Sequence, residues 1–158
     1  MVLQEVSSER LHVPLSPHWP ANDPIVEQFV VDRIYDLVKE AEGDVVIIVD
    51  ACVIRHDAKK EVVQLLKETC FPVYATPMGK TAVDENWKRY GGVNSNFISY
   101  FPSLTCCKIY IGSITHPDVK EKVEGAKLII SIGSLGSDFN TGNFSYKIST
   151  RRHIEASF

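Results

Sequence analysis

Two short aliphatic runs constrain the fold of this chain more than any other feature of its sequence. They are VVIIV within residues 44–51 and LIISI within residues 127–134, each bounded by polar residues or glycine. Runs of this length and composition are typical of strands buried on both faces of a parallel sheet. FPVYATP at residues 71–77 reads as another short strand, and RRHIEASF at residues 151–158 as a last extended piece.

Helical patterns alternate with these strands. Residues 22–43 carry Asn22 or Asp23 as a cap, Pro24 in the first turn and an end near Gly43. Their apolar residues recur at helical spacing, at Ile25, Val26, Phe29, Val30, Ile34, Leu37, Val38 and Ala41.

Two further helices are predicted at residues 56–70 and 115–126. Asp57 is the expected cap of the first, and Thr115 caps the second with Pro117 in its first turn. Because parallel strands need helical crossovers, this alternation predicts an α/β fold, a three-layer Rossmann-like parallel sheet with helices on both faces.

Length and composition limit the possible functions. The 158 residues suit one domain, and a net charge of −3 offers no strong field for nucleic acid or an anionic membrane. No apolar run approaches the roughly 20 residues that span a bilayer, and the first residues do not resemble a signal peptide, so we expect a cytoplasmic protein. Residues 1–21 contain three prolines and predict an extended linker, and the four cysteines are expected to be reduced thiols.

Several longer strings make the pattern specific. DACVIRHDAKKE, FPVYATPMGK, DENWKRYGG and the stretch HPDVKEKVEGAKLIISIGSLGSDFNTGNFSY together resemble the central domain of fungal-type pyruvate decarboxylases. The resemblance implies a central Rossmann-like domain over residues 22–158, taken from an enzyme that uses thiamine diphosphate and Mg²⁺.

The resemblance also implies what lies elsewhere. In that family the cofactor and the metal are held by an N-terminal and a C-terminal domain, whose motifs are absent from this sequence. We therefore expect no catalytic residue, cofactor site or metal site in this chain, and no turnover by the chain alone. The implied partners are the two missing domains and, for the whole enzyme, a second subunit in a homodimer or homotetramer.

Residues 93–108 interrupt the resemblance. Their removal restores the continuous string RYGGIYIGSITHPDV, and sixteen codons are 48 in-frame nucleotides, a length usual for fungal introns. Val93 must begin with GT, Asn94 must be AAY, Leu104 and Thr105 can be written CTAAC, and Lys108 can end in AG. These are donor, branch point and acceptor in order, which favours a retained intron. The alternative is a genuine surface loop, since insertions at loops cost little entropy.

The resemblance points to a regulatory site for a 2-oxo acid such as pyruvate, at Cys52, Arg55 and His56. A thiolate can add to a carbonyl, an Arg can pair with a carboxylate, and a protonated His favours the thiolate. The alternative is a structural cysteine at a strand end beside two solvated residues.

The glycine-rich stretch after residue 132 has two interpretations. It lacks the full G-x-G-x-x-G pattern and no helical pattern follows, which disfavours nucleotide binding. The resemblance instead implies a mobile activation loop, whose residues are Ser137, Asp138, Phe139, Asn140, Thr141 and Gly142.

Three hypotheses for function follow. The first is the structural or regulatory central domain of an enzyme that converts pyruvate to acetaldehyde and CO₂, with pyruvate as a weak regulatory ligand. The second is a free-standing module that binds a small molecule or nucleotide. The third is a truncated gene product without a function.

Overall fold

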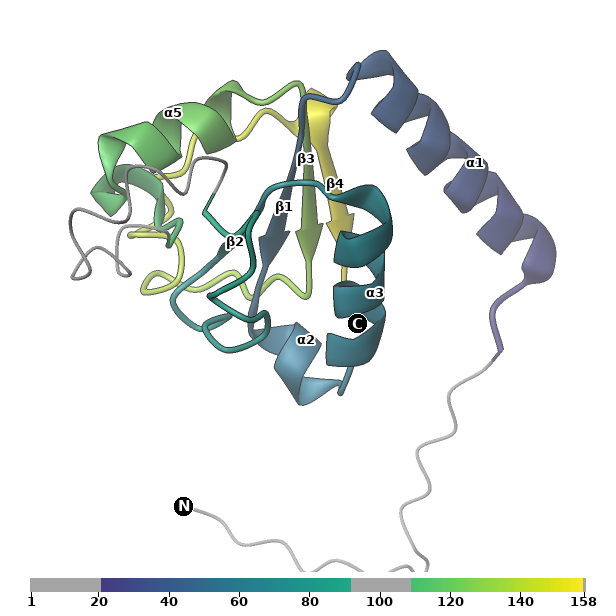
Figure 1. Cartoon of the computed structure of the whole chain (residues 1–158), viewed down its shortest axis with the longest axis horizontal. Helices are drawn as coiled ribbons and strands as arrows, with labels where there is room; N and C mark the ends of the chain where they lie inside the picture. Colours follow the sequence, from purple (N-terminus) through teal and green to yellow (C-terminus); the bar gives the residue numbers. More distant parts are fainter. Residues whose placement is uncertain (1–20, 92–108, 158) are drawn as a thin grey trace, which may run out of the picture.

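Four parallel strands form the centre of the fold (Figure 1). The computed structural model describes residues 21–91 and 109–157. The sheet has the order β2-β1-β3-β4. Its strands are β1 (Val45–Val49), β2 (Val73–Ala75), β3 (Leu128–Ile132) and β4 (His153–Ala156). All three pairings are parallel, so the predicted parallel sheet is confirmed.

Helices cover both faces of this sheet, which confirms the predicted three-layer α/β fold. α1 (Pro24–Glu40) and α3 (Lys59–Thr69) lie on one face, and α5 (Pro117–Gly125) lies on the other (Figure 1). The short helix α2 (Ala51–Arg55) follows β1 directly. Two single 3₁₀ turns, η3 (Gly112–Ile114) and η4 (Thr150–Arg152), precede α5 and β4.

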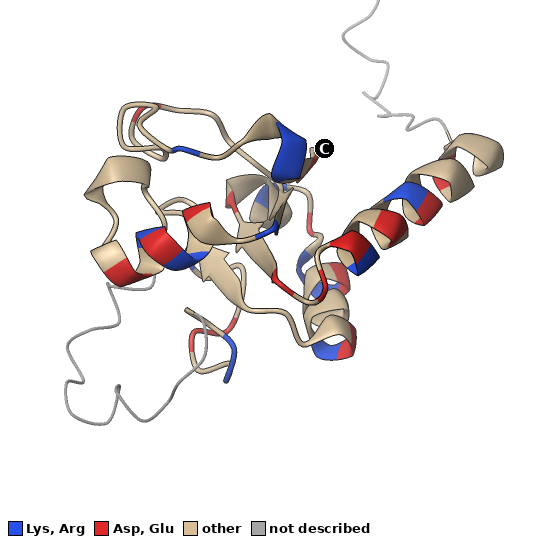
Figure 2. Cartoon of the chain, turned by 90° about the horizontal axis from the view of Figure 1, so that it is seen from above, with Lys and Arg blue, Asp and Glu red and all other residues tan. Residues whose placement is uncertain are grey.

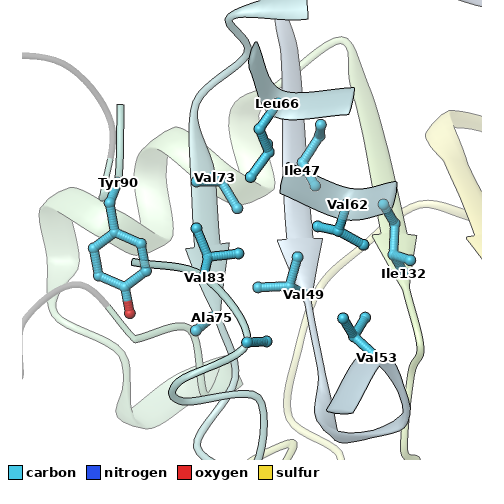
Figure 3. Packing of buried hydrophobic residues seen from close by; sticks show 11 residues of the cluster. Ile47, Val49, Val53, Val62, Leu66, Val73, Ala75, Val83, Tyr90 and Ile132 are labelled. Carbon is cyan, nitrogen blue, oxygen red and sulfur yellow. The ribbon is translucent and has the colours of Figure 1, made fainter. Parts of the chain in front are cut away.

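The core consists of two layers because β1 is buried on both faces. On the face of α3, Val62 and Leu66 pack with the residues of the sheet that point toward them, among them Ile47, Val49 and Ile132 (Figure 3). On the opposite face, Val119 and Val123 of α5 pack with Val46, Ile48 and Ile129. The alternation of these residues along β1 and β3 is the period of two that a strand imposes.

Two predicted helix caps are wrong. Asp57 has φ of 55°, and Ala58 precedes α3 without a side-chain cap. The Thr115 hydroxyl accepts a hydrogen bond from the backbone N–H of Ile111 at 2.6 Å, so it closes the preceding turn, and His116 occupies the cap position of α5. The cap of α1 is as predicted, since the Asp23 side chain accepts from Ile25 N–H at 2.9 Å.

The strand next to β2 is interrupted. Tyr90 bridges Val73, and Ile109 bridges Ala75, both in the parallel sense. Because Val73 and Ala75 are two residues apart, Ile109 takes the place that residue 92 would hold in an unbroken strand. The two sides of the insertion are therefore halves of one edge strand, in register with β2.

The proposed insertion at 93–108 lies outside the described residues, as does nearly all of the proposed linker at 1–21. The register of its flanks agrees with removal of the segment to within one residue. Deletion of 93–108 leaves Gly92 as one residue more than the register needs, and glycine suits a bulge in an edge strand. That these residues are a retained intron stays a prediction, which sequencing of the mature transcript across codons 90–112 tests.

We predict that deletion of residues 93–108 stabilises the chain. The deletion joins two halves of a strand that already pair with β2, and the shorter connection loses less entropy on folding. We expect the free energy of unfolding to rise by about 2 kcal/mol, measured by urea denaturation.

Two matched variants define this test. Deletion of 92–108 restores the register without a bulge and should be at least as stable as deletion of 93–108. Replacement of 93–108 by sixteen Gly and Ser residues should leave stability near that of the parent. A deletion variant that unfolds at lower urea than the parent would show that the segment contributes to folding.

Candidate functional site

Asp50 lies at the centre of the carboxyl edge of the sheet. It follows β1 directly and is the N-cap of α2. Its side chain is buried, with the residue 4% exposed, and its oxygens accept four hydrogen bonds. Oδ1 accepts from Ala51 N–H at 2.6 Å and from the Thr76 hydroxyl at 2.5 Å. Oδ2 accepts from Leu135 N–H at 2.7 Å and from the Asn140 amide at 2.6 Å.

The turn after β2 reaches Asp50 through Thr76. The Thr76 hydroxyl donates to Asp50 and accepts from Gly79 N–H at 3.1 Å. Gly79 lies so close to β1 that an added Cβ would stand 2.3 Å from the carbonyl oxygen of Val49. The TPMG string is therefore explained by packing, because any larger residue in its fourth position would displace the turn from β1.

The side chain of Asn140 connects the glycine-rich loop to Asp50. It is 2% exposed, and its Nδ2 donates both to Asp50 and to the carbonyl of Leu135, the latter at 3.0 Å. Its Oδ1 accepts from Met78 N–H at 3.1 Å, so the loop also contacts the turn after β2. One amide thus connects three segments that are far apart in the sequence.

We name Asp50, Thr76 and Asn140 the Asp50 hub. The three strings that make the sequence specific, DAC, TPMG and SDFNTG, each contribute one of its members. The four hydrogen bonds that the Asp50 oxygens accept all come from donors within the protein. Such donors stabilise a buried charge. This arrangement fixes loop positions and suits a structural role better than proton transfer.

Asp50 and Thr76 were not predicted as site residues. The signal for Asp50 was present in the sequence, since an acidic residue directly after a buried strand must find donors. The sequence could not show which donors, because Thr76 and Asn140 are 26 and 90 residues away.

The predicted regulatory residues lie on α2. Cys52 is half-buried, while Arg55 and His56 are exposed. Spacings of three and four residues place the three side chains on one side of this short helix. The Cys52 thiol donates to the carbonyl of Ser134 at 3.9 Å, and its N–H donates to the carbonyl of Gly133 at 3.0 Å. Cys52 therefore lies against the start of the glycine-rich loop.

The predicted activation loop is ordered by contacts of its own. The Ser137 hydroxyl accepts from Asn140 N–H at 3.2 Å, and the Thr141 hydroxyl donates to the carbonyl of Ser137 at 2.7 Å. The Asp138 carbonyl accepts from Asn143 N–H at 2.6 Å. Phe139, between these groups, is 72% exposed.

A left-handed turn follows the loop. Gly142, Asn143 and Phe144 have φ of 57°, 59° and 57°, a conformation that costs a residue with a Cβ about 1–2 kcal/mol. Ser145 holds this turn, because its hydroxyl accepts from Ser113 N–H at 2.9 Å and lies 2.7 Å from the Ser113 hydroxyl. The strained turn presents Phe144 to solvent.

A cavity of about 100 Å³ lies between the Asp50 hub and β4. Its walls include Tyr110, Tyr146, Ser131, His153 and Glu155, and none of its lining residues is Lys or Arg. The His153 ring lies 2.7 Å from the Ser131 hydroxyl, and burial lowers the pKa of His153, an effect that Glu155 opposes. A cavity with carboxylates and no fixed cation disfavours phosphate groups, so the geometry does not support the nucleotide-binding alternative.

Several other features bear on the predicted sites. Cys52 and Cys70 are free thiols, as predicted. Within 21–91 and 109–157, no three His, Cys, Asp or Glu side chains are placed to hold a metal ion. In the same ranges, no helix is both long and apolar enough to cross a membrane.

Comparison with known proteins identifies the class of this domain. Residues 31–105 match the family described as "Thiamine pyrophosphate enzyme, central domain". With this match and the parallel three-layer fold, the chain belongs to the central-domain family of thiamine pyrophosphate enzymes.

Within that class, the chain is similar to fungal pyruvate decarboxylases. It is 48% identical over 143 residues to pyruvate decarboxylase of Candida albicans, covering 90% of this chain and 22% of the relative. It is 43% identical over 150 residues to isozyme 2 of Saccharomyces cerevisiae and 42% identical over 151 residues to the Candida glabrata protein. These matches cover 95% and 96% of this chain and 24% of each relative, so the chain spans about a quarter of the length of its curated relatives.

We predict that Asn140→Ala destabilises the domain. The substitution removes one of the four donors to the buried Asp50 carboxylate and the acceptor of Met78 N–H. We expect a loss of about 2 kcal/mol in the free energy of unfolding, measured by urea denaturation.

Phe139→Ala is the matched control. It changes the neighbouring residue of the same loop, whose side chain is exposed, and should alter stability by less than about 0.5 kcal/mol. Equal effects of the two substitutions would show that the Asp50 hub does not hold the loop.

Proposed function

We propose that this chain is the structural and regulatory central domain of a thiamine diphosphate-dependent enzyme that decarboxylates a 2-oxo acid. The observation that carries the proposal is the Asp50 hub, in which the three specific strings of the sequence meet. The similarity to fungal pyruvate decarboxylases supports pyruvate as the substrate of the whole enzyme, with acetaldehyde and CO₂ as its products.

The chemistry itself is assigned to other parts of the whole enzyme. No group of described carboxylates, histidines or cysteines fits Mg²⁺, and the donors around Asp50 leave no cradle for a diphosphate. Thiamine diphosphate, Mg²⁺ and the catalytic residues therefore belong, in this proposal, to an N-terminal and a C-terminal domain. The proposal places the enzyme in the cytoplasm as a homodimer or homotetramer, in which this domain holds its neighbours at a fixed distance.

A test of this function is an exchange of domains. We would replace the matched region of the Candida albicans relative with residues 21–157 of this chain, lacking 93–108. The chimera should release acetaldehyde from pyruvate with kcat/KM within about tenfold of the parent, because the hub and its loop are intact. A coupled alcohol dehydrogenase assay measures the product.

Two further proteins complete the comparison. The chimera with Asn140→Ala should lose stability, and with it activity at elevated temperature. The 158-residue chain alone, with thiamine diphosphate and Mg²⁺, should release nothing above the buffer blank. Acetaldehyde from the chain alone, or a folded chimera without activity, would contradict the proposal.

Regulation by pyruvate is the second part of the proposal, and Cys52 is its proposed nucleophile. The thiol would add to the C2 carbonyl of pyruvate, forming a C–S bond while its proton passes to the carbonyl oxygen, which becomes a hydroxyl. The exposed Arg55 on the same side of α2 can pair with the carboxylate, and a protonated His56 would favour the thiolate. The contact between Cys52 and Ser134 would pass this change to the loop that carries Asn140.

We predict that pyruvate binds the deletion variant lacking 93–108 with a Kd of about 1 mM or weaker. Calorimetry should show heat with pyruvate and none with ADP or FAD. Carbon-13 NMR with pyruvate labelled at C2 should show an upfield hemithioketal signal.

Substitutions at the two described cysteines make the assignment specific. Cys52→Ser should abolish the new carbon signal, and Cys70→Ser, which changes the exposed thiol at the end of α3, should leave it unchanged. A signal that survives Cys52→Ser would remove Cys52 from the proposal without affecting the domain assignment.

A further inference from the structure

The cavity beside the Asp50 hub has no part in the function proposed above. It lies on the face of the sheet that α5 covers, and its lining includes Ile48, Ser131 and Glu155, one residue from each of β1, β3 and β4. In the register of the sheet, Ile48 pairs with Ser131 and Ser131 pairs with Glu155, so the three form a continuous row. Asn140 and Thr141 of the glycine-rich loop line the same cavity. The loop therefore contacts whatever the cavity holds.

Three polar side chains at the wall of the cavity are available to a ligand. None of the salt bridges within residues 21–91 and 109–157 involves Glu155, which is exposed. In the same ranges the Tyr146 hydroxyl has no hydrogen-bond partner. His153 Nε2 lies 2.7 Å from the Ser131 hydroxyl, and Nδ1 has no hydrogen-bond partner among the described residues. Because Glu155 and Tyr146 are both exposed, a ligand can reach the cavity from solvent.

The fixed charge at this cavity is negative. Two of its lining residues are the carboxylates Asp50 and Glu155, and none is Lys or Arg. Figure 2 shows few charged residues on the segment between β3 and η4, whereas α1 and α5 carry many of both signs. Arg152, which precedes His153, places its guanidinium on two backbone carbonyls at the carboxyl end of α5, at 2.9 and 3.3 Å. Within the described part of the chain, no Lys or Arg balances the charge of Glu155.

Two tyrosine rings complete the wall. Tyr110 is buried and its hydroxyl donates to Glu124 Oε1 at 3.1 Å, so it offers its ring to the cavity. Tyr146 offers both its ring and its hydroxyl. Aromatic rings attract cations, most strongly where water is excluded. The volume of about 100 Å³ is well below the roughly 300–1,000 Å³ of pockets for drug-sized ligands, which limits the occupant to a small molecule.

The ionisation of His153 agrees with a positively charged ligand. Burial lowers the pKa of His153, an effect that Glu155 opposes. The imidazole is therefore neutral at pH 7 and can accept a hydrogen bond, whereas a protonated ring would repel a cation. The other titratable residues that line the cavity are Asp50, Tyr110, Tyr146 and Glu155, while Glu124 and Arg152 on neighbouring elements are bonded elsewhere.

We propose that this cavity binds a small organic cation, a free molecule that carries a protonated amine or guanidinium group. The Glu155 carboxylate pairs with the charge, and the Tyr146 hydroxyl and the His153 ring accept N–H groups of the ligand. The oxygens of Asp50 already accept four hydrogen bonds, so this carboxylate contributes through its charge alone. The inference does not depend on the reaction proposed for the whole enzyme.

Methylguanidinium is the probe for this site, and N-methylurea is its neutral counterpart of nearly the same shape. In titrations of the full 158-residue chain labelled with ¹⁵N, methylguanidinium should shift the amide signals of residues 131–136 and 153–156 with a Kd of about 1 mM. N-methylurea should bind at least about tenfold more weakly, and acetate should produce no shift at these amides. The difference between the first two compounds measures the contribution of the charge.

Two carboxylate substitutions locate the bound probe. Glu155→Gln should weaken methylguanidinium binding at least about tenfold, because it removes the unpaired charge and preserves the shape of the side chain. Glu121→Gln is the matched control, since Glu121 is exposed on α5 and does not line the cavity. Its Kd should stay within about twofold of the parent value.

The pH dependence gives a readout that a merely structural role would not produce. Lowering the pH from about 7 to about 5 should protonate His153 and weaken methylguanidinium binding by at least about threefold. His153→Gln stays neutral and can still bond to the Ser131 hydroxyl. This variant should bind the probe at pH 7 within about threefold of the parent and should lose most of the pH dependence.

Three results would overturn the proposal. One is the absence of shifts at the cavity with methylguanidinium in a chain that gives the spectrum of a folded protein. Another is equally strong binding of N-methylurea, which would assign the cavity to neutral polar molecules. The third is calorimetric binding of methylguanidinium to the isolated chain but not to the chimera described above, which would assign the cavity to a side chain of the whole enzyme.

Discussion

The buried carboxylate of Asp50 determines how the carboxyl edge of this domain is arranged. A charge with 4% exposure can persist only if donors replace the water it has lost, and here four donors come from three separate segments. The free-energy cost of leaving this carboxylate without a donor favours one position of each donor segment over the others. A displaced turn after β2, or a displaced glycine-rich loop, would leave the carboxylate short of a partner and cost more than a neutral hydrogen bond.

The elements that the sequence predicted well are those whose pattern is local. β1 and β3 were evident because consecutive aliphatic residues have few alternatives to a buried strand, and Asp23 and Pro24 marked the start of α1 correctly. α2 was missed because five residues are too few to show a helical period. The caps at Asp57 and Thr115 were mispredicted because each residue type suits several local turns, and only the tertiary structure decides among them.

The exposed apolar residues at the amino end of α1 and the Asp50 hub show two limits of a prediction from sequence; the exposed residues are Ile25, Val26, Phe29 and Val30. The spacing predicts that these residues form one apolar face of the helix, but whether an apolar face is covered depends on neighbours that its own sequence does not contain. The hub was hidden for the opposite reason, since its members are polar residues whose partners are distant in the chain. The resemblance identified DAC, TPMG and SDFNTG as one family's strings, and the structure supplies the physical reason that they occur together.

The hub also limits how the glycine-rich loop can change during the proposed activation. Asn140 is anchored by Asp50, Leu135 and Met78, so movement of the whole stretch 137–142 would have to break three hydrogen bonds, one of them to a buried charge. Movement is less costly beyond Asn140, where the left-handed turn of 142–144 already stores strain and depends on the Ser113 and Ser145 hydroxyls. Asn140 therefore acts as the fixed end of the loop. A signal from Cys52 through Ser134 would therefore have to reach the residues beyond Asn140 by displacements small enough to leave its three hydrogen bonds in place.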